Sequence, residues 1–248
     1  MELQACICYN NSVEQLAKSR IYMDRGNKRR MKAVFINGSP RKNWNTDKLL
    51  QSAAKGAESV GAEVKYYDLY DLQFSGCRSC FACKVKDSQT NGVCTYPDAL
   101  KPVMDDIRPA DVLVLGTPVY LGNMSAQLNL FWERLMFANV SYSSYDQDRK
   151  MKKAKRCAII ITMGATMEQM HQLGYDRHFN QMGRQMGHMM GDEPAEILYS
   201  FDAYQFSDYS KYNISADRAD PVQKAKHLEE EYPLDLERTY DLGRRICQ

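Results

Sequence analysis

Short apolar runs that end in glycine or in a turn recur along this chain, and they constrain its fold more than any other feature. The first run, KAVFIN, is rich in β-branched and aromatic residues and ends at Gly38. Runs such as DVLVLG and RCAIIIT are almost continuously apolar, which is typical of strands buried on both faces of a parallel sheet. The expected strands are residues 32–37, 64–69, 111–116, 156–162 and 196–201.

Helical patterns fill the intervals between these runs. Residues 46–60 place Leu49, Leu50 and Ala53 on one face and end near Gly61, where a left-handed cap is expected. The other expected helices are residues 98–107, 125–137 and 167–190, then 222–231 and 236–246 on either side of Pro233. This alternation predicts an α/β fold, with a doubly wound parallel sheet of five strands and helices on both faces.

The first thirty residues have no clear link to this pattern. They contain a short amphipathic piece and the basic run Lys28, Arg29 and Arg30, and Met31 directly precedes the first strand. We therefore expect residues 1–30 to be an N-terminal appendage and residues 31–248 to form one domain, because a chain of 248 residues can bury a full core.

Charge and hydropathy narrow the range of partners. The 33 Lys and Arg against 31 Asp and Glu give a net charge of +2, which is no electrostatic reason to expect nucleic acid or a membrane surface. The apolar runs fall far short of the ~20 residues of a transmembrane helix. The near balance of charges favours a small-molecule partner. A signal peptide would need an apolar run where this chain has Asn10, Asn11 and Ser12. We therefore expect a cytoplasmic protein whose cysteines are reduced.

The loop after the first strand has the composition of a phosphate site. In NGSPRKNWNT, Gly38 permits a sharp exit from the strand, and Ser39, Asn45 and Thr46 offer short polar side chains. The following helix presents free backbone amides, and Arg41 adds a forked cationic donor. The loop matches neither GxxxxGK[ST] nor GxGxxG, so one terminal phosphate fits better than a pyrophosphate. By itself, the loop is equally compatible with an ordinary turn capped by Thr46.

Three segments together carry a family resemblance: MKAVFINGSPRKNWNT, GCRSCFAC and TPVYLGNMSAQLNLFWERL. They resemble the NADPH-dependent FMN reductase and iron–sulfur flavoprotein group of the flavodoxin-like superfamily, over residues 31–164. The resemblance implies a flavodoxin-like domain that binds FMN, whose phosphate would be contacted by Ser39, Arg41, Asn45 and Thr46. Members of this group typically carry glycine or serine where this chain has Trp44, so we expect the outer wall of the phosphate site to be reshaped.

A second flavin loop is expected after the third strand. Pro118 stiffens this turn, Gly122 lets the backbone approach a flat ring, and Tyr120 supplies an aromatic wall. By the resemblance, the flavin contacts are Thr117, Pro118, Val119, Tyr120, Gly122 and Asn123, with Met163 and Gly164 closing on the pyrimidine side. The alternative is a plain structural turn.

Four of the eight cysteines are clustered, as a C-x2-C-x2-C pattern with a fourth cysteine after ten intervening residues: Cys77, Cys80, Cys83 and Cys94. Such a set can hold an iron–sulfur cluster, although the last gap is shorter in the iron–sulfur flavoproteins that the chain resembles. Zinc, a redox dithiol that exchanges electrons with the flavin, and idle thiols are the alternatives. Because the carboxyl ends of parallel strands share one edge, we expect this loop near the flavin.

Glu133 and Arg134 follow each other near the end of the expected helix over residues 125–137. We expect them to form a solvated or intersubunit ion pair and not a catalytic one.

The expected function is that of an FMN-dependent NAD(P)H oxidoreductase that passes electrons to a quinone, another small electrophile or a protein acceptor. FMN is the expected cofactor and NAD(P)H the co-substrate, and a [4Fe-4S] cluster is left open. No protein acid or base is required, because the flavin carries the chemistry. The alternative is an iron–sulfur flavoprotein that relays electrons between proteins without a dedicated organic substrate. The resemblance also implies a homodimer or homotetramer.

Overall fold

The computed structural model describes residues 29–140, 142, 155–191, 193–215 and 219–248. The chain divides into two units between Arg30 and Met31. The second unit, Met31–Gln248, contains every helix and strand that the described residues form. The expected appendage, residues 1–30, lies almost entirely outside the described residues.

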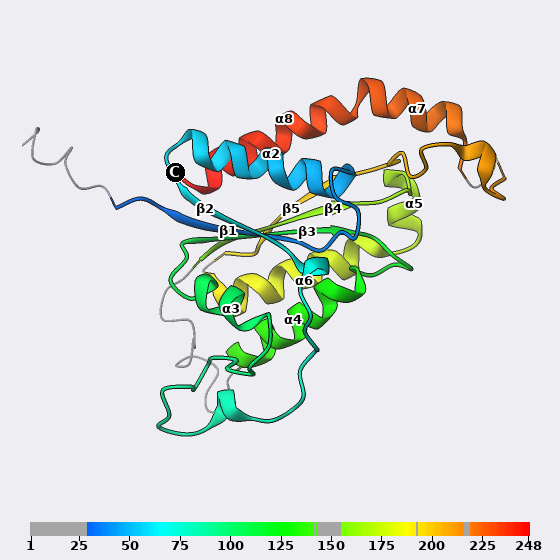
Figure 1. The fold of residues 1–248 in the computed structure, drawn as a ribbon. Helices are drawn as coiled ribbons and strands as arrows, with labels where there is room; N and C mark the ends of the chain where they lie inside the picture. Colours follow the sequence, from blue (N-terminus) through cyan, green and yellow to red (C-terminus); the bar gives the residue numbers. More distant parts are fainter. Residues whose placement is uncertain (1–28, 141, 143–154, 192, 216–218) are drawn as a thin grey trace, which may run out of the picture. The chain divides into compact units, whose positions relative to one another are not determined.

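Five parallel strands form the central sheet (Figure 1). Their spatial order is β2-β1-β3-β4-β5, and all neighbouring pairs are parallel. This is the flavodoxin-like order, in which the chain reverses its direction of winding between β1 and β3. The predicted α/β fold with a five-stranded parallel sheet is thus confirmed. The strands are β1 (Lys32–Asn37), β2 (Glu63–Asp68), β3 (Val112–Pro118), β4 (Arg156–Thr162) and β5 (Glu196–Ser200).

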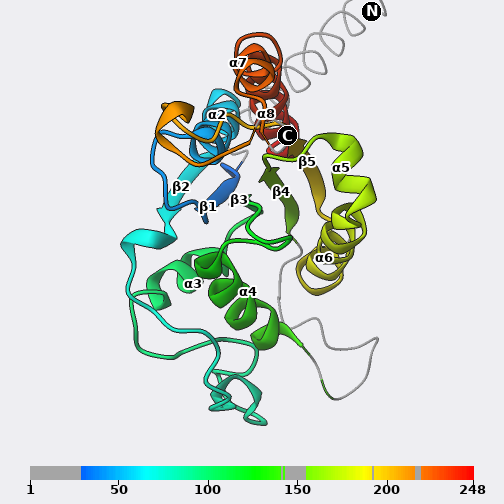
Figure 2. The same ribbon diagram turned by 90° about the vertical axis from the view of Figure 1, so that its right-hand side faces the viewer.

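Helices cover both faces of this sheet (Figure 2). One face carries α2 (Asn45–Ser59) and α8 (Tyr232–Ile246), with α7 (Pro221–Glu230) leading into α8. The other face carries α3 (Lys101–Ile107), α4 (Ala126–Asn139) and α6 (Tyr175–Met190), and α5 (Met167–Gln172) precedes α6. Short 3-10 turns lie in the loops as η1 (Leu69–Asp71), η2 (Ala82–Lys84) and η3 (Tyr209–Lys211).

The central strands are apolar on both sides because a separate core lies on each face. Val34 and Ile36 of β1 pack with α3, α4 and α6, whereas Ala33 and Phe35 pack with α2 and α8. Successive side chains of a strand point to opposite faces. Two cores therefore explain why the sequence shows continuous apolar runs and not an alternating pattern.

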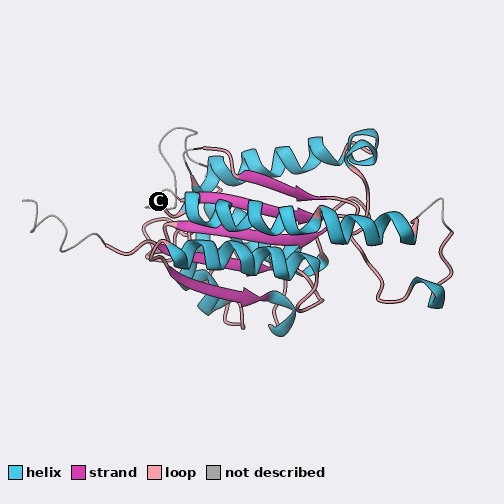
Figure 3. Cartoon of the chain, turned by 90° about the horizontal axis from the view of Figure 1, so that it is seen from above, coloured by secondary structure: helices cyan, strands magenta, loops and turns pink. Residues whose placement is uncertain are grey.

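Two glycines allow α2 and α8 to pack side by side on one face (Figure 3). A Cβ on Gly56 would lie 2.0 Å from the Tyr240 carbonyl oxygen, and a Cβ on Gly243 would lie 1.8 Å from the Ala53 carbonyl oxygen. Both distances are much shorter than a van der Waals contact between carbon and oxygen, so neither position has room for a side chain. The two helix backbones therefore touch directly, each through a glycine of its own.

The single helix expected over residues 167–190 is wrong. α5 ends at Gln172 and α6 begins at Tyr175, because Gly174 between them has a φ of 71°. By contrast, the expected division into two C-terminal helices is present, but it falls at Glu231 and not at Pro233. The second helix begins at Tyr232 and not at Leu236, because Pro233 lies in the first turn of α8, where its missing amide hydrogen removes no helical bond. None of the helices in the described ranges is both long and apolar enough to span a bilayer.

Candidate functional site

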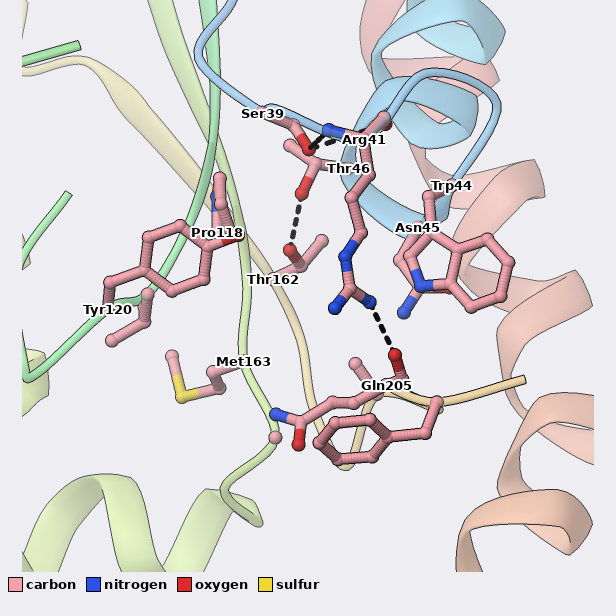
Figure 4. Close-up of a pocket in the computed structure, with 14 residues that line it drawn as sticks. Ser39, Arg41, Trp44, Asn45, Thr46, Pro118, Tyr120, Thr162, Met163 and Gln205 are labelled. Atoms are coloured by element: carbon pink, nitrogen blue, oxygen red, sulfur yellow. Dashed lines mark hydrogen bonds between the residues drawn. The ribbon is translucent and has the colours of Figure 1, made fainter. Parts of the chain in front are cut away.

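The loops that follow β1, β3 and β4 meet at the carboxyl edge of the sheet and enclose a cavity of about 220 Å³ (Figure 4). In a doubly wound sheet, this edge beside the point of reversal is where ligands bind. The predicted cofactor-binding residues line the cavity, except Thr117, Gly122 and Asn123. Its lining residues are Ser39, Arg41, Trp44, Asn45, Thr46, Pro118, Val119, Tyr120, Thr162, Met163, Gly164, Ala203, Gln205 and Phe206.

The first loop is shaped by Asp47, a buried carboxylate that sequence reasoning missed. Its Oδ1 accepts hydrogen bonds from the Asn37 side-chain amide at 3.2 Å and from the Tyr66 hydroxyl at 2.5 Å. Its Oδ2 accepts from the backbone amide of Asn43 at 2.5 Å. Asn37 in turn accepts from the backbone amide of Ser39 at 2.9 Å. Protein groups alone therefore fix the path of the loop from strand to helix.

Hydrogen-bond donors gather at one end of the cavity. The backbone amides of Trp44, Asn45 and Thr46, at the start of α2, have no acceptor among the described residues. Such amides, together with the positive end of the helix dipole, favour an anion. Arg41 projects over the same end, and the hydroxyls of Thr46 and Thr162 lie 2.6 Å apart between the loops (Figure 4). This end of the cavity suits a phosphate ester.

The loop after β3 forms the opposite wall and turns tightly at its tip. Tyr120 and Asn123 exchange two backbone hydrogen bonds, at 2.9 and 3.0 Å, and Leu121 and Gly122 between them have φ angles of 51° and 79°. Gly122 is also required by space, because a Cβ there would lie 2.8 Å from the ring of Tyr175. Burial raises the pKa of the Tyr120 hydroxyl, although Arg41 opposes the shift, so this hydroxyl is protonated at neutral pH.

Three predicted contact residues support this loop instead of lining the cavity. Thr117 is fully buried, and its hydroxyl accepts from the backbone amide of Ser125 at 3.1 Å. The side chain of Asn123 accepts from the backbone amide of Met124 at 2.8 Å. Gly122 borders a neighbouring hollow. Direct contact of these three residues with a cofactor stays a prediction.

A segment beyond β5 completes the cavity, and sequence reasoning missed it too. We call residues 203–206 the strap. Arg41 donates through Nη1 to the Gln205 carbonyl, and Asn45 donates through Nδ2 to the Tyr204 carbonyl at 2.9 Å. The Gln205 side chain lies against Gly164, where a Cβ would be 2.1 Å from its Nε2. The strap falls in a tyrosine-rich tract without periodicity, so only its place after the last strand could have indicated a role.

A buried ion pair anchors the start of the strap. Lys224 of α7 donates through Nζ to Asp202 Oδ1 at 2.7 Å and to the Gly164 carbonyl at 2.9 Å. Both side chains are largely buried, at 4% and 12% exposure. The Asp202 backbone amide donates to the Ala165 carbonyl at 3.0 Å. Helix α7 thus ties the strap to the loop after β4.

A more open hollow of about 590 Å³ adjoins the cavity. The two spaces share Val119, Met163, Gly164 and Gln205. The hollow is otherwise lined by Leu121, Gly122, Ala165, Gln169, Leu173, Tyr175, Ala219 and Lys224. A molecule held in the cavity can therefore be approached by a second molecule from the side of the hollow.

Comparison with known proteins decides the family. The model of the NADPH-dependent FMN reductase family matches residues 31–192. The chain belongs to this family. An iron–sulfur flavoprotein of Methanocaldococcus jannaschii is 34% identical over 104 residues, which are 42% of this chain and 51% of that protein. The chain spans about half the length of the curated relatives it matches at this level.

Solved structures agree on the fold of this FMN reductase family member. An azoreductase from Bacillus anthracis superimposes with a TM-score of 0.57 at 14% identity, over 87% of this chain and 99% of that chain. An NAD(P)H:quinone oxidoreductase from Methanothermobacter marburgensis superimposes with a TM-score of 0.56 at 13% identity, over 88% and 97%. At these identities the likeness shows the fold alone.

The cysteine loop of this FMN reductase family member lies away from the cavity. The four predicted metal ligands line a separate space beside Arg134 and Phe137 of α4, namely Cys77, Cys80, Cys83 and Cys94. Arg134 lies nine residues after Ser125, the N-cap of α4, which is about 14 Å along a helix. The expectation that this loop lies near the flavin edge is wrong. Residues 72–98 are long enough to run along α4, as Figure 1 shows, so their origin at a strand end does not determine where they lead.

As placed, these thiols do not fit a metal cluster. The space that they line measures about 20 Å³, which is room for about one water molecule. Within the described ranges, no three His, Cys, Asp or Glu side chains are grouped as metal ligands. Burial raises the pKa of the Cys83 thiol, although the charge of Lys84 opposes the shift. The metal assignment stays a prediction.

Arg134 holds the cysteine loop in place, which corrects the expected solvated pair with Glu133. Its side chain is only 1% exposed and forms an ion pair with Asp98. The guanidinium also donates to Cys94 Sγ at 3.3 Å and to the Ser75 carbonyl at 3.3 Å. A charge three residues before the end of the expected helix, residues 125–137, indicated a surface position. Only the packing of the distant cysteine loop over Arg134 explains its burial.

Proposed function

We propose that this protein is an FMN-dependent NAD(P)H oxidoreductase that passes electrons to a quinone, another small electrophile or a protein acceptor. The observation that carries the proposal is the cavity at the carboxyl edge of the sheet. It has anion-binding groups at one end and a wall of Pro118, Val119 and Tyr120 at the other. FMN has the same two ends, a phosphate and a flat ring system.

The groups at the phosphate end fit FMN. The amides of Asn45 and Thr46 lack acceptors within the described residues, and so does the buried indole nitrogen of Trp44. Buried donors without an acceptor are rare in folded proteins, and a phosphate would satisfy donors at this end of the cavity. Arg41 supplies a charge-assisted donor, and Ser39 fixes the loop by accepting from the Arg41 backbone amide at 3.2 Å.

At the other end, the chain would position the ring between the loops after β3 and β4. When bound, FMN supplies the redox chemistry, by accepting a hydride and passing electrons on. Tyr120 and Pro118 would cover one side of the ring, and Met163 of the loop after β4 lines the cavity on the other. The Tyr120 hydroxyl is protonated and can donate a hydrogen bond. The open hollow beside Gly122 leaves room for NAD(P)H and the acceptor to approach.

An electron relay through an iron–sulfur cluster is the second candidate. It is favoured by the names of the curated relatives, which are iron–sulfur flavoproteins. The placement of the four cysteines around a space of about 20 Å³ does not support it. Iron and sulfide analysis after anaerobic purification separates the two candidates. About four iron atoms per chain would support the relay, whereas an iron-free flavoprotein would support the two-electron reductase.

We also propose that the protein forms a homodimer or homotetramer. Leu121 is fully exposed at the tip of the loop after β3, and Leu173, which lines the same hollow, is more than half exposed. Exposed apolar side chains that gather at one site are typical of interfaces. A monomeric mass at micromolar concentration, measured by light scattering, would contradict this assembly.

The proposed activity is tested with the purified protein. We expect a flavin absorption spectrum, release of FMN on denaturation, and oxidation of NADH or NADPH that depends on an added quinone. Parallel assays with the two nicotinamides decide which donor is used. A protein that is purified without flavin and cannot take up FMN would contradict the proposal.

The phosphate assignment is tested by substitution. Arg41→Ala and Thr46→Ala are each expected to weaken FMN binding by about 1 to 3 kcal/mol, because the site loses a charged or a polar contact. Lys42→Ala is the matched control, since Lys42 forms a surface ion pair with Asp71 and does not line the cavity. Titration of the apoprotein by flavin fluorescence gives the affinities. Unchanged FMN affinity in both Arg41→Ala and Thr46→Ala would remove the assignment.

A further inference from the structure

The cysteine loop folds back on itself and brings two of its cysteines to the same place. Ten residues separate Cys83 from Cys94. The backbone amide of Gly92 nevertheless donates to the Cys83 carbonyl at 2.9 Å. One residue earlier in each segment, the loop is held again, because the Thr90 hydroxyl donates to the Ala82 carbonyl at 2.9 Å. Cys94, two residues beyond Gly92, is therefore returned to the side of Cys83.

Both ends of this ten-residue insertion are attached to the end of α4, on the side of that helix away from the sheet (Figure 1 and Figure 2). Lys84, the neighbour of Cys83, donates through Nζ to the Val140 carbonyl at 2.6 Å. Arg134 donates through Nε to Cys94 Sγ at 3.3 Å. The Arg134 side chain is almost fully buried, so its position is fixed by packing. One helix end therefore holds the two cysteines in register.

The space that these thiols line is too small for a metal cluster but suits direct contact between sulfur atoms. It measures about 20 Å³. A cluster needs a cavity between its ligands, whereas a disulfide needs only that two sulfurs approach to about 2 Å. Cys83 is buried and Cys94 is half-buried. A small molecule can therefore reach Cys94 from solvent, with Cys83 behind it.

We propose that Cys83 and Cys94 form a redox-active dithiol that hydrogen peroxide converts into a disulfide. The Cys94 sulfur attacks one peroxide oxygen, the O–O bond breaks, and the leaving hydroxide takes up a proton to become water. Arg134 stabilises the negative charge of the attacking sulfur. The Cys83 sulfur then attacks the sulfenic acid on Cys94, the S–O bond breaks, and a second water leaves. The two thiols thus lose two electrons and two protons, which the peroxide takes up.

The test uses the full chain, reduced with dithiothreitol, freed of the reductant under nitrogen, and exposed to hydrogen peroxide without NAD(P)H. Trypsin cuts after Arg78, Lys84 and Lys86. The disulfide would therefore join a peptide that starts at Ser79 to one that starts at Asp87. Mass spectrometry without reduction detects this linked pair. We expect it to rise from a trace to most of the chain after peroxide, and to disappear when dithiothreitol is added again.

Cys80→Ser is the matched control, because Cys80 lies in the same tryptic peptide as Cys83 but is exposed, next to Phe81 with a φ of 56°. The link should persist in Cys80→Ser and be absent from Cys83→Ser and Cys94→Ser. Alanine variants replace any serine variant that does not fold, as judged by circular dichroism.

Three results would overturn the inference: no linked pair in the wild type, loss of the link in Cys80→Ser, or a disulfide between two chains, seen as a doubled mass on a non-reducing gel. Iron bound by these thiols would overturn it as well. Because no step involves the flavin, each of these results leaves the proposed FMN site as it stands.

Discussion

The carboxylate of Asp47 accepts hydrogen bonds from Asn37, Tyr66 and Asn43, and each donor lies on a different segment. Asn37 ends β1, Tyr66 belongs to β2, and Asn43 lies in the loop that enters α2. Because the carboxylate is only 2% exposed, water cannot replace these bonds. One side chain therefore connects the phosphate loop to the edge of the sheet.

Asp47→Asn is expected to destabilise the fold. The amide group keeps one acceptor oxygen but turns its NH₂ toward a buried donor, which should lower the free energy of unfolding by about 1 to 3 kcal/mol. Unfolding in urea measures the change. Tyr66→Phe is the comparison, because it removes one donor and leaves the carboxylate bonded to Asn37 and Asn43. If Asp47→Asn is as stable as the wild type, the carboxylate does not hold the loop.

At the scale of single residues, the sequence indicated the donors of the site but not the groups that hold them. Ser39, Arg41, Asn45 and Thr46 were predicted because a phosphate loop is a local motif between a strand and a helix. Arg41 meets Gln205 across a separation of 164 residues, and no local pattern encodes such a pair. The buried role of Arg134 was missed for the same reason, since its partners lie on a distant loop.

At the scale of elements, the packing of α2 on α8 depends on two glycines inside helices. Glycine is unfavourable in a helix interior by about 1 kcal/mol relative to alanine, so its presence there needs a structural reason. Gly56 and Gly243 each face the backbone of the other helix, at Tyr240 and Ala53 respectively. Their lack of a side chain brings α8 close enough to cover the α2 face of the sheet.

Gly243→Ala is expected to lower the free energy of unfolding by about 2 kcal/mol or more, although alanine favours the helix. The added methyl group would lie 1.8 Å from the Ala53 carbonyl oxygen, so the two helices must separate. Gly183→Ala is the matched control in α6, where the nearest atoms are the flexible end of the Ile197 side chain at 3.0 Å and the Ala195 carbonyl oxygen at 3.2 Å, both far beyond 1.8 Å. Thermal unfolding followed by circular dichroism compares the two. A Gly243→Ala variant as stable as the Gly183→Ala variant would show that the helices can move apart freely.

The strands were predictable from the sequence to within about two residues. For the central strands β1, β3 and β4, the reason is that burial on both faces leaves a continuous apolar run. The edge strands β2 and β5 are only partly buried. β4, for example, spans Arg156–Thr162 as expected. The helix over residues 167–190 was not predictable as two pieces, since Gly174 in a helical pattern is often tolerated. The left-handed backbone of Gly174 separates the two helices, and the ring of Tyr175, the first residue of α6, lies against Gly122.

At the scale of the whole molecule, the region matched by the family model ends before the folded domain does. The family model stops at residue 192, before β5, the strap, α7 and α8. The cavity takes Ala203, Gln205 and Phe206 from beyond that point. The second core likewise takes Tyr232, Leu242 and Ile246 of α8. The part of the chain that carries the family motifs is therefore too short to complete either the core or the cavity.

This difference leads to a prediction about shortened chains. Residues 31–248 are expected to unfold cooperatively at the same temperature as the full chain and to bind FMN with the same affinity, because the second unit contains both cores and the whole cavity. Residues 31–192 are expected not to fold, since removal of α8 would expose the apolar face of α2 and the sheet. Circular dichroism and FMN titration of the two shortened chains measure both outcomes. Loss of FMN binding in residues 31–248 would mean that the first thirty residues belong to the flavin domain, and a folded chain of residues 31–192 would mean that α8 is dispensable for the core.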